Sequence, residues 1–76
     1  MKIGTIRTNK LIKLCEHCGW RQDRIRGDHL ALVKDGCPRP IIIPLKKTAT
    51  VWLILQVTKE LGIKNRNEYF RLLREL

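Results

Sequence analysis

The sequence predicts one small α+β domain whose elements follow the order αβββαα. Three observations predict this class. The 76 residues leave room for a single domain. Apolar residues recur at helical spacing near both ends, and turn residues divide the segment between them into three short strand-like runs. We therefore expect residues 1–76 to form one domain, with the helices packed on one face of a three-stranded antiparallel sheet.

The first helix is expected from Thr8 to about Cys18. Thr8 is a suitable N-cap, because its hydroxyl can accept a hydrogen bond from a free backbone N–H of the first turn. Gly19 is placed to end the helix, since glycine readily adopts the left-handed backbone found there. The residues on the expected apolar side are Leu11, Ile12, Leu14, Cys15 and Cys18.

Three strands are expected next. Helical spacing stops at Trp20, and the first strand runs from there to about Arg26. Gly27 is a natural break or bulge position before the second strand, which covers residues 29–34.

The turn into the third strand is marked by Asp35-Gly36. This pair predicts a type I′ hairpin turn, in which both central residues have positive φ. The chain then returns through Pro40 into the isoleucines at 41–43, and Pro44 ends the strand because proline cannot donate to a ladder.

The second helix is expected from Thr48 or Thr50 to Leu61, with Gly62 as its C-terminal cap. Its composition would also suit a buried strand, but a length of more than ten residues favours a helix. The residues at helical spacing are Val51, Ile54, Leu55, Thr58 and Leu61.

The last helix is short and begins at a sequence that resembles a capping box. Asn65 is followed three residues later by Glu68, so both side chains can accept from free N–H groups of the first turn. The residues expected to return to the core are Tyr69, Leu72, Leu73 and Leu76.

The charge balance indicates a polyanionic partner. Sixteen Lys and Arg residues against seven Asp and Glu give a net charge of +9 and a pI near 10.1. Nucleic acid is favoured over a membrane surface, because no basic amphipathic segment stands apart from the fold. Residues 1–50 carry a net +7 and residues 51–76 a net +2, so the first two-thirds should face the nucleic acid. The basic candidates there include Lys10, Lys13, Arg21, Arg24 and Arg26.

Several classes of protein are disfavoured. No apolar run approaches the roughly 18 residues of a membrane span. The N-terminus lacks the apolar stretch and cleavage site of a signal peptide, so we expect a cytoplasmic protein without a membrane partner. Three cysteines cannot all pair within one molecule, which indicates reduced thiols or a metal.

The order of these features resembles the HicA toxin family. Arg24, Gly27 and His29 match its signature, an upstream basic residue followed by Gly-Ser-His or a variant at the start of the second strand. The Asp35-Gly36 turn and the strand ending at Pro44 match as well. The resemblance covers most of the chain and implies a fold like that of a double-stranded-RNA-binding domain. It also implies a bacterial endoribonuclease that cleaves messenger RNA and is neutralised by a HicB antitoxin.

Two positions depart from the family pattern. Asp28 stands where the family usually has serine or another small residue, and a histidine often found after the strand-ending proline is replaced around Leu45-Lys46. An acidic neighbour could orient His29 and favour its protonated form, or it could repel phosphate. Both outcomes remain open at the level of the sequence.

His29 is the candidate catalytic residue. Strand alternation should place it on the face opposite Leu30 and Leu32, away from the core. An imidazole exchanges protons near neutral pH, which suits attack of a ribose 2′-hydroxyl on the adjacent phosphate without a metal. Arg24, Arg26 and Lys46 are expected to bind phosphate and stabilise its developing charge. The wider RNA-binding set adds Lys10, Lys13, Arg21 and Gly27. No cofactor is expected.

Two other functions compete with this one. A non-catalytic RNA-binding module of the same fold would have the same charge, and only His29 argues against it. A zinc-binding nucleic-acid module is the third reading, because Cys15, Cys18 and Gly19 have the spacing of a zinc knuckle. Cys37 and one histidine would have to complete its four ligands. Otherwise Cys15 and Cys18 are small hydrophobic residues on the buried side of the first helix.

The second helix also offers a candidate interface. It is apolar over more of its circumference than one core-facing stripe requires, since Val51, Ile54 and Leu55 can supply that stripe. We therefore expect Trp52 and Leu53, with Gln56 beside them, to contact an antitoxin or a second copy. The alternative is that a thin domain buries them all.

Overall fold

The computed structural model describes residues 2–76. Its elements are β1 (Ile6–Arg7), α1 (Thr8–His17), β2 (Arg21–Arg26), β3 (His29–Lys34), β4 (Cys37–Pro44), β5 (Thr48–Ala49), α2 (Val51–Glu60) and α3 (Arg66–Glu75). The main sheet is antiparallel in the order β2-β3-β4, and β1 pairs with β5 in a separate two-residue ribbon. The α+β class and the order αβββαα are confirmed, while the ribbon was not predicted from the sequence.

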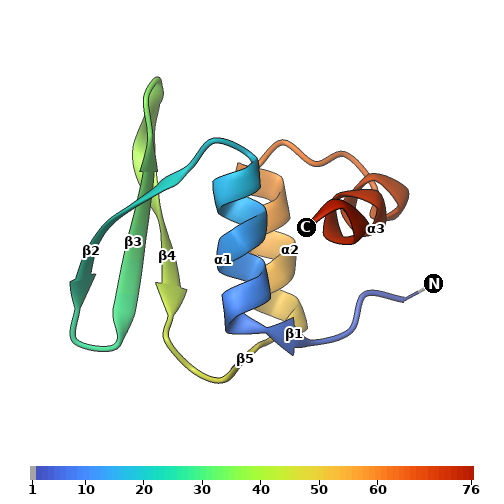
Figure 1. Ribbon diagram of the computed structural model, residues 1–76, viewed down its shortest axis with the longest axis horizontal. Coiled ribbons are helices and arrows are strands. Elements are labelled where there is room, and N and C mark those ends of the chain that lie inside the picture. Colours follow the sequence, from blue (N-terminus) through green and yellow to red (C-terminus); the bar gives the residue numbers. More distant parts are fainter. Residues whose placement is uncertain (1) are drawn as a thin grey trace.

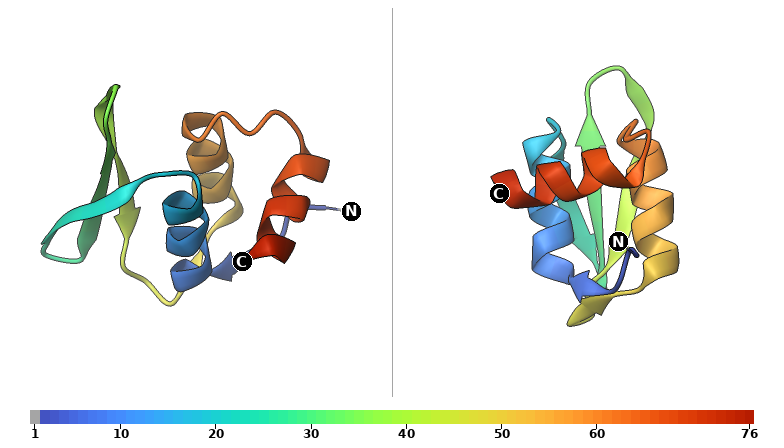
Figure 2. Two further views of the ribbon diagram at one scale, coloured as in Figure 1. Left: turned by 45° about the horizontal axis from the view of Figure 1, so that its top comes forward. Right: turned by 90° about the vertical axis from the view of Figure 1, so that its right-hand side faces the viewer.

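The elements form three layers (Figure 1). Helices α1 and α2 lie side by side over one face of the sheet, and none of the helices in residues 2–76 covers the other face. Helix α3 packs on the side of α1 and α2 that is turned away from the sheet, and it crosses them (Figure 2). Within residues 2–76, no helix has the length and apolar character needed to cross a membrane.

The core fills the space between the sheet and the helices. Alternate residues of β3 and β4 point into this core. Trp20, which follows the end of α1, is 4% exposed. The buried hydrophobic residues of the core are Leu11, Ile12, Leu14, Cys15, Trp20, Leu30, Leu32, Ile41, Ile43, Ala49, Ile54, Val57 and Tyr69. Because this core covers only one face of the sheet, residues of the opposite parity on the same strands face solvent.

The N-cap of α1 lies one residue earlier than the sequence predicted. Arg7 is the N-cap, and no side chain caps this end. Thr8 is instead the first helical residue, and its backbone N–H donates to the Lys47 carbonyl at 3.1 Å. The ribbon of β1 and β5 brings that carbonyl into reach, so a distant backbone acceptor satisfies the free N–H of the first helical residue.

The C-terminus of α1 explains the Cys-x-x-Cys-Gly sequence. Gly19 has φ +93°, its N–H donates to the Glu16 carbonyl, and the Trp20 N–H donates to the Cys15 carbonyl. This pair of bonds is a Schellman motif, which requires a residue that tolerates positive φ. The ammonium of Lys34 adds a 2.9 Å bond to the Cys18 carbonyl. The glycine in this motif therefore ends a helix.

The two hairpins of the sheet use different turns. Gly27 has φ +63° in the turn between β2 and β3, as its predicted role as a break requires. In the next turn Gly36 has φ +86°, but Asp35 does not have positive φ. The predicted type I′ turn is therefore wrong, because only one central residue takes the left-handed conformation. The third strand also begins at Cys37, earlier than predicted.

Helix α2 has the predicted cap but a different buried face. Thr50 is the N-cap and its hydroxyl accepts from the Leu53 N–H. Leu55 was predicted on the core-facing stripe, but it is 46% exposed, while Val57 is 2% exposed. The helix is rotated about its axis relative to the prediction, so Ile54, Val57 and Thr58 form the stripe that faces the core.

Helix α3 begins as predicted at Asn65, whose side chain accepts from the Glu68 N–H at 2.9 Å. The Glu68 carboxylate accepts from the Lys64 N–H at 3.4 Å. Tyr69 is buried at 1% exposure and joins the core, whereas Leu76 stays exposed at 39%.

Candidate functional site

His29 stands on the face of the sheet that no helix covers. It begins β3, opposite Arg26 on one side and Pro44 on the other. Leu30 and Leu32 are 2% and 0% exposed on the helix side, whereas the His29 side chain is 53% exposed. The predicted orientation of His29, away from the core, is confirmed.

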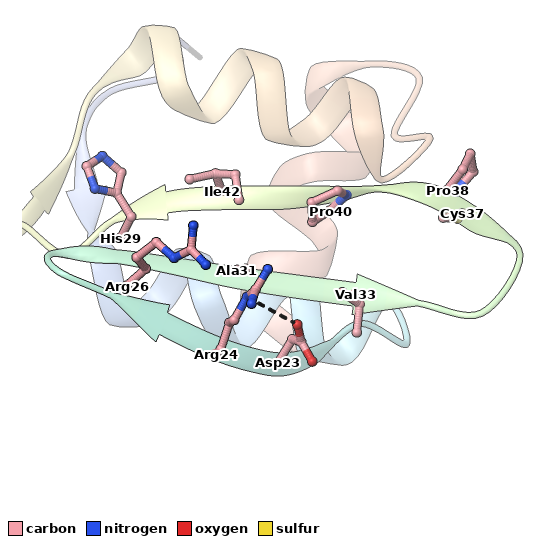
Figure 3. A pocket seen from close by; sticks show the side chains of 10 residues that line it. All are labelled: Asp23, Arg24, Arg26, His29, Ala31, Val33, Cys37, Pro38, Pro40 and Ile42. Atoms are coloured by element: carbon pink, nitrogen blue, oxygen red, sulfur yellow. Dashed lines mark ion pairs between the residues drawn. The ribbon is translucent and has the colours of Figure 1, made fainter.

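A shallow groove of about 500 Å³ runs across this uncovered face. Figure 3 shows the His29 imidazole and the guanidinium groups of Arg26 and Arg24 on this same face, near one end of the groove. The remaining lining residues are Asp23, Ala31, Val33, Cys37, Pro38, Pro40 and Ile42. The groove thus joins a polar end, which carries the titratable imidazole, to a mostly apolar floor.

The two arginines at the polar end differ in whether an acidic side chain lies beside them. Arg26 lies directly opposite His29 in the sheet register, so their Cβ atoms are about 5 Å apart. Arg24 lies opposite Ala31, and its Nε is 4.0 Å from the Asp23 carboxylate. Across residues 2–76, Arg26 has no ion pair. Arg26 is therefore the cation most available to an anion placed beside the imidazole.

Asp28 contacts His29 directly. The Asp28 Oδ1 lies 2.9 Å from the His29 Nδ1. The Asp28 carbonyl also accepts from the Leu45 N–H at 2.6 Å, which ties the β2–β3 turn to the segment after Pro44. Lys46 follows Leu45 and is exposed, so it lies at the same end of the sheet as His29.

Other basic candidates lie elsewhere. Lys10 and Lys13 are on α1, and they line a separate cleft with Ile6 and Leu76. Because α1 covers the opposite face of the sheet, the two lysines do not share a surface with His29 (Figure 1). The Arg21 guanidinium is 3.3 Å from the Asp35 carboxylate, in an ion pair of its own. Lys10 and Lys13 therefore lie apart from His29, whereas Arg24 and Arg26 lie beside it and Arg21 stands opposite Val33 at the other end of β2. RNA contacts of Lys10, Lys13 and Arg21 stay a prediction.

The apolar floor of the groove was missed by the sequence reasoning. The sequence analysis gave Ala31, Val33 and Ile42 no role beyond their strands, and their alternation with Leu30, Leu32 and Ile41 places them on the other face. The signal was available: if every helix packs on one face, the opposite parity of β3 and β4 must be open.

The cysteines do not assemble with histidines into a metal site. Cys15 is 0% exposed within the core, and Cys37 lines the groove on the far side of the sheet. Burial raises the pKa of the Cys15 thiol to about 12, which disfavours the thiolate that zinc requires. Among residues 2–76, no three His, Cys, Asp or Glu side chains form a group able to hold a metal ion. The buried, hydrophobic interpretation of Cys15 fits these observations.

The same burial predicts a loss of stability at high pH. The pKa of Cys15 rises from 9.0 to about 12 in the folded chain, so between these values only the unfolded chain loses the proton. The free energy of unfolding should therefore fall as pH rises above 9, by up to about 4 kcal/mol once pH exceeds 12. Burial also raises the pKa of Tyr69, which acts in the same direction.

Urea denaturation at pH 8, 9, 10 and 11 measures this effect. The variant Cys15→Ala, which is less stable at every pH, should show a shallower fall because the thiol is gone. An equal fall in both proteins would contradict the assignment to Cys15.

The exposed face of α2 carries an unpartnered tryptophan. Trp52 is 73% exposed and Gln56 is exposed, as the interface prediction requires. Leu53 is half-buried and packs against the core, and its remaining surface lines a cleft with Gln56, so its contact with a partner stays a prediction. Leu55 also lies beside Trp52, because the two are one helical turn apart and both are exposed.

The comparisons with known proteins bear on these features. A family model described as the HicA toxin of bacterial toxin-antitoxin systems matches residues 8–63, a span that runs from the start of α1 to just beyond α2. Neither the search of curated proteins nor that of solved structures found a match. The matched span includes His29, both arginines of the groove and the whole main sheet. The chain therefore belongs to the HicA toxin family, and its role is that of a toxin in a bacterial toxin-antitoxin system.

Proposed function

We propose that this chain is a metal-independent endoribonuclease that cleaves messenger RNA at the uncovered face of the sheet. The observation that carries the proposal is the placement of the exposed His29 imidazole beside the unpaired Arg26 at the end of a groove. A proton-transfer group and a phosphate-binding cation are the two parts that RNA transesterification needs. Membership of the HicA family supports the same activity.

The reaction divides between these residues. His29 takes the proton from a ribose 2′-hydroxyl as its oxygen bonds to the adjacent phosphorus. The bond from phosphorus to the 5′ oxygen breaks, and that oxygen takes a proton from water. Arg26 and Arg24 bind the phosphate oxygens, whose negative charge grows in the transition state, and Lys46 extends the positive surface. The products are a 2′,3′-cyclic phosphate and a free 5′-hydroxyl.

The requirement for the 2′-hydroxyl gives a direct test. An RNA oligonucleotide and the DNA of the same sequence are incubated with the chain in EDTA, and the ends of the products are mapped. We expect cleavage of the RNA with 2′,3′-cyclic phosphate ends, and no cleavage of the DNA. Binding of RNA without cleavage would favour the non-catalytic RNA-binding module, and cleavage of both polymers would contradict the 2′-hydroxyl route.

Arg26 is expected to set part of the salt dependence of RNA binding. In a His29→Ala background, which prevents cleavage, Arg26→Ala should reduce the slope of log affinity against log salt by about 0.7, the value for one phosphate contact on a single strand. Titration of a fluorescent RNA at several salt concentrations measures the slope. Arg21→Ala is the matched control, since its guanidinium is already paired with Asp35. Equal changes in the two variants would contradict the role of Arg26.

We also propose that a HicB-type antitoxin binds the exposed face of α2. Trp52 and Leu55 are large apolar residues that are 73% and 46% exposed, and buried aromatic residues often dominate the free energy of binding at protein interfaces. The family gives the chain a toxin-antitoxin partner.

Replacing Trp52 with alanine should therefore weaken the antitoxin complex by about 30-fold or more. Since Trp52 is 73% exposed, the stability of the free toxin should change by less than about 0.5 kcal/mol. Calorimetric titration with the antitoxin measures the first effect, with Gln56→Ala as the neighbouring control. An unchanged affinity would contradict this interface, and a toxin dimer that dissociates on mutation would assign it to a second copy.

A further inference from the structure

The contact between Asp28 and His29 has a chemical consequence that neither the family nor the charge of the chain implies. We propose that Asp28 is a positioning residue, which holds the proton of the neutral His29 ring on Nδ1 and leaves Nε2 free to accept the proton of the ribose 2′-hydroxyl. This inference rests on the proposed ribonuclease function. It names the reacting nitrogen and a second residue that controls it.

The geometry supports this assignment. An ionised carboxylate can only accept hydrogen bonds, so the 2.9 Å distance between Asp28 Oδ1 and His29 Nδ1 favours a proton over a lone pair on Nδ1. In a neutral imidazole one nitrogen is then a donor and the other an acceptor. The acceptor is then Nε2, in a side chain that is 53% exposed.

The turn makes the contact possible. Successive residues of a regular strand point to opposite faces, so an aspartate just before His29 within a strand would face away from it. Asp28 instead lies with Gly27 in the two-residue turn between β2 and β3. The φ of +63° at Gly27 allows the chain to reverse there. The Asp28 carbonyl is held by the Leu45 N–H at 2.6 Å. This hydrogen bond holds the backbone of Asp28 against the segment that follows β4.

The alternative is that Asp28 only repels phosphate. The two roles differ in their kinetic effect: loss of a positioning carboxylate lowers kcat, whereas loss of a repulsive one lowers KM. Asp28 stands where the family usually has serine, and the contact gives this aspartate a defined partner, the His29 ring.

Nuclear magnetic resonance tests the tautomer directly. Long-range ¹H–¹⁵N correlation spectra of the labelled chain, recorded where both rings are neutral, should show His29 with its proton on Nδ1. His17 is an internal reference: its Nε2 lies 3.3 Å from Glu75 Oε1, so its proton should be on Nε2. In Asp28→Asn the side-chain amide can donate to Nδ1, and the His29 proton should move to Nε2. A His29 proton on Nε2 in the parent would overturn the proposal even if the chain cleaves RNA.

Kinetics complete the test. Asp28→Asn should lower kcat by about 10-fold with KM little changed, a smaller loss than removal of the ring, because the ion pair is exposed. Glu60→Gln is the control: it removes the same charge from an exposed residue of α2 and should leave kcat unchanged. A faster Asp28→Asn enzyme with a lower KM would show repulsion of phosphate and overturn the proposal. Absence of RNA cleavage by the parent would instead overturn the proposed function itself.

Discussion

Replacing His29 with alanine is expected to lower the rate of RNA cleavage by about 10²- to 10⁴-fold, the range typical for loss of a proton-transfer group. The fold should be unaffected, because the side chain is 53% exposed and lies on the face of the sheet opposite the core. RNA affinity should change little, since Arg24, Arg26 and Lys46 remain. The loss should therefore appear in kcat.

The second histidine of the chain is the matched control for this result. His17 lies at the end of α1 and faces Glu75 of α3, away from the groove. His17→Ala should cleave RNA at the parental rate. Single-turnover cleavage with enzyme in excess measures both variants, and circular dichroism checks their folding. If His17→Ala and His29→Ala lost activity equally, the effect would not belong to the groove.

Replacing Leu32 with alanine is expected to have the largest effect on stability. Leu32 is 0% exposed at the centre of β3, where it packs between the sheet and the helices. Truncation of a fully buried leucine costs about 2–5 kcal/mol, through lost burial and the cavity left behind. A 76-residue domain is stable by only about 4 to 11 kcal/mol. This single change should therefore remove a large part of the total.

Thermal unfolding measures this prediction. A loss of 2 kcal/mol corresponds to a Tm lower by at least about 8 °C in a domain of this size. Leu55→Ala removes the same atoms from a half-exposed site on α2 and should cost only about 1 kcal/mol. Similar losses in the two variants would contradict the core described above.

Most of the fold was predictable because its signals are local. Gly27 and Gly36 mark the hairpin turns, and Thr50 and Asn65 cap their helices through side-chain hydrogen bonds to nearby N–H groups. Each of these roles is decided within four residues of the chain.

The errors concern features decided by distant segments. The cap of α1 depends on the Lys47 carbonyl, which the β1–β5 ribbon brings to Thr8 from across the sequence. The buried face of α2 depends on how the helix meets the sheet, which decided between Leu55 and Val57.

The candidate site shows the same division. Strand alternation placed His29 on the open face, and the cross-strand register brought Arg26 to it. Lys10 and Lys13 were grouped with them by charge alone, although both belong to α1, which packs on the other face of the sheet. The contact of Asp28 with His29 could not be chosen from sequence, because it depends on the conformation of the turn.

The measurement that tests the central claim most directly is a time course of RNA cleavage in EDTA by the parent and His29→Ala, purified in the same way. The account predicts cleavage by the parent and a rate at least about 100-fold lower for the variant. EDTA excludes metal-dependent contaminants, and parallel purification excludes the others. Equal cleavage by the two proteins, or none by a folded parent that binds RNA, would contradict it.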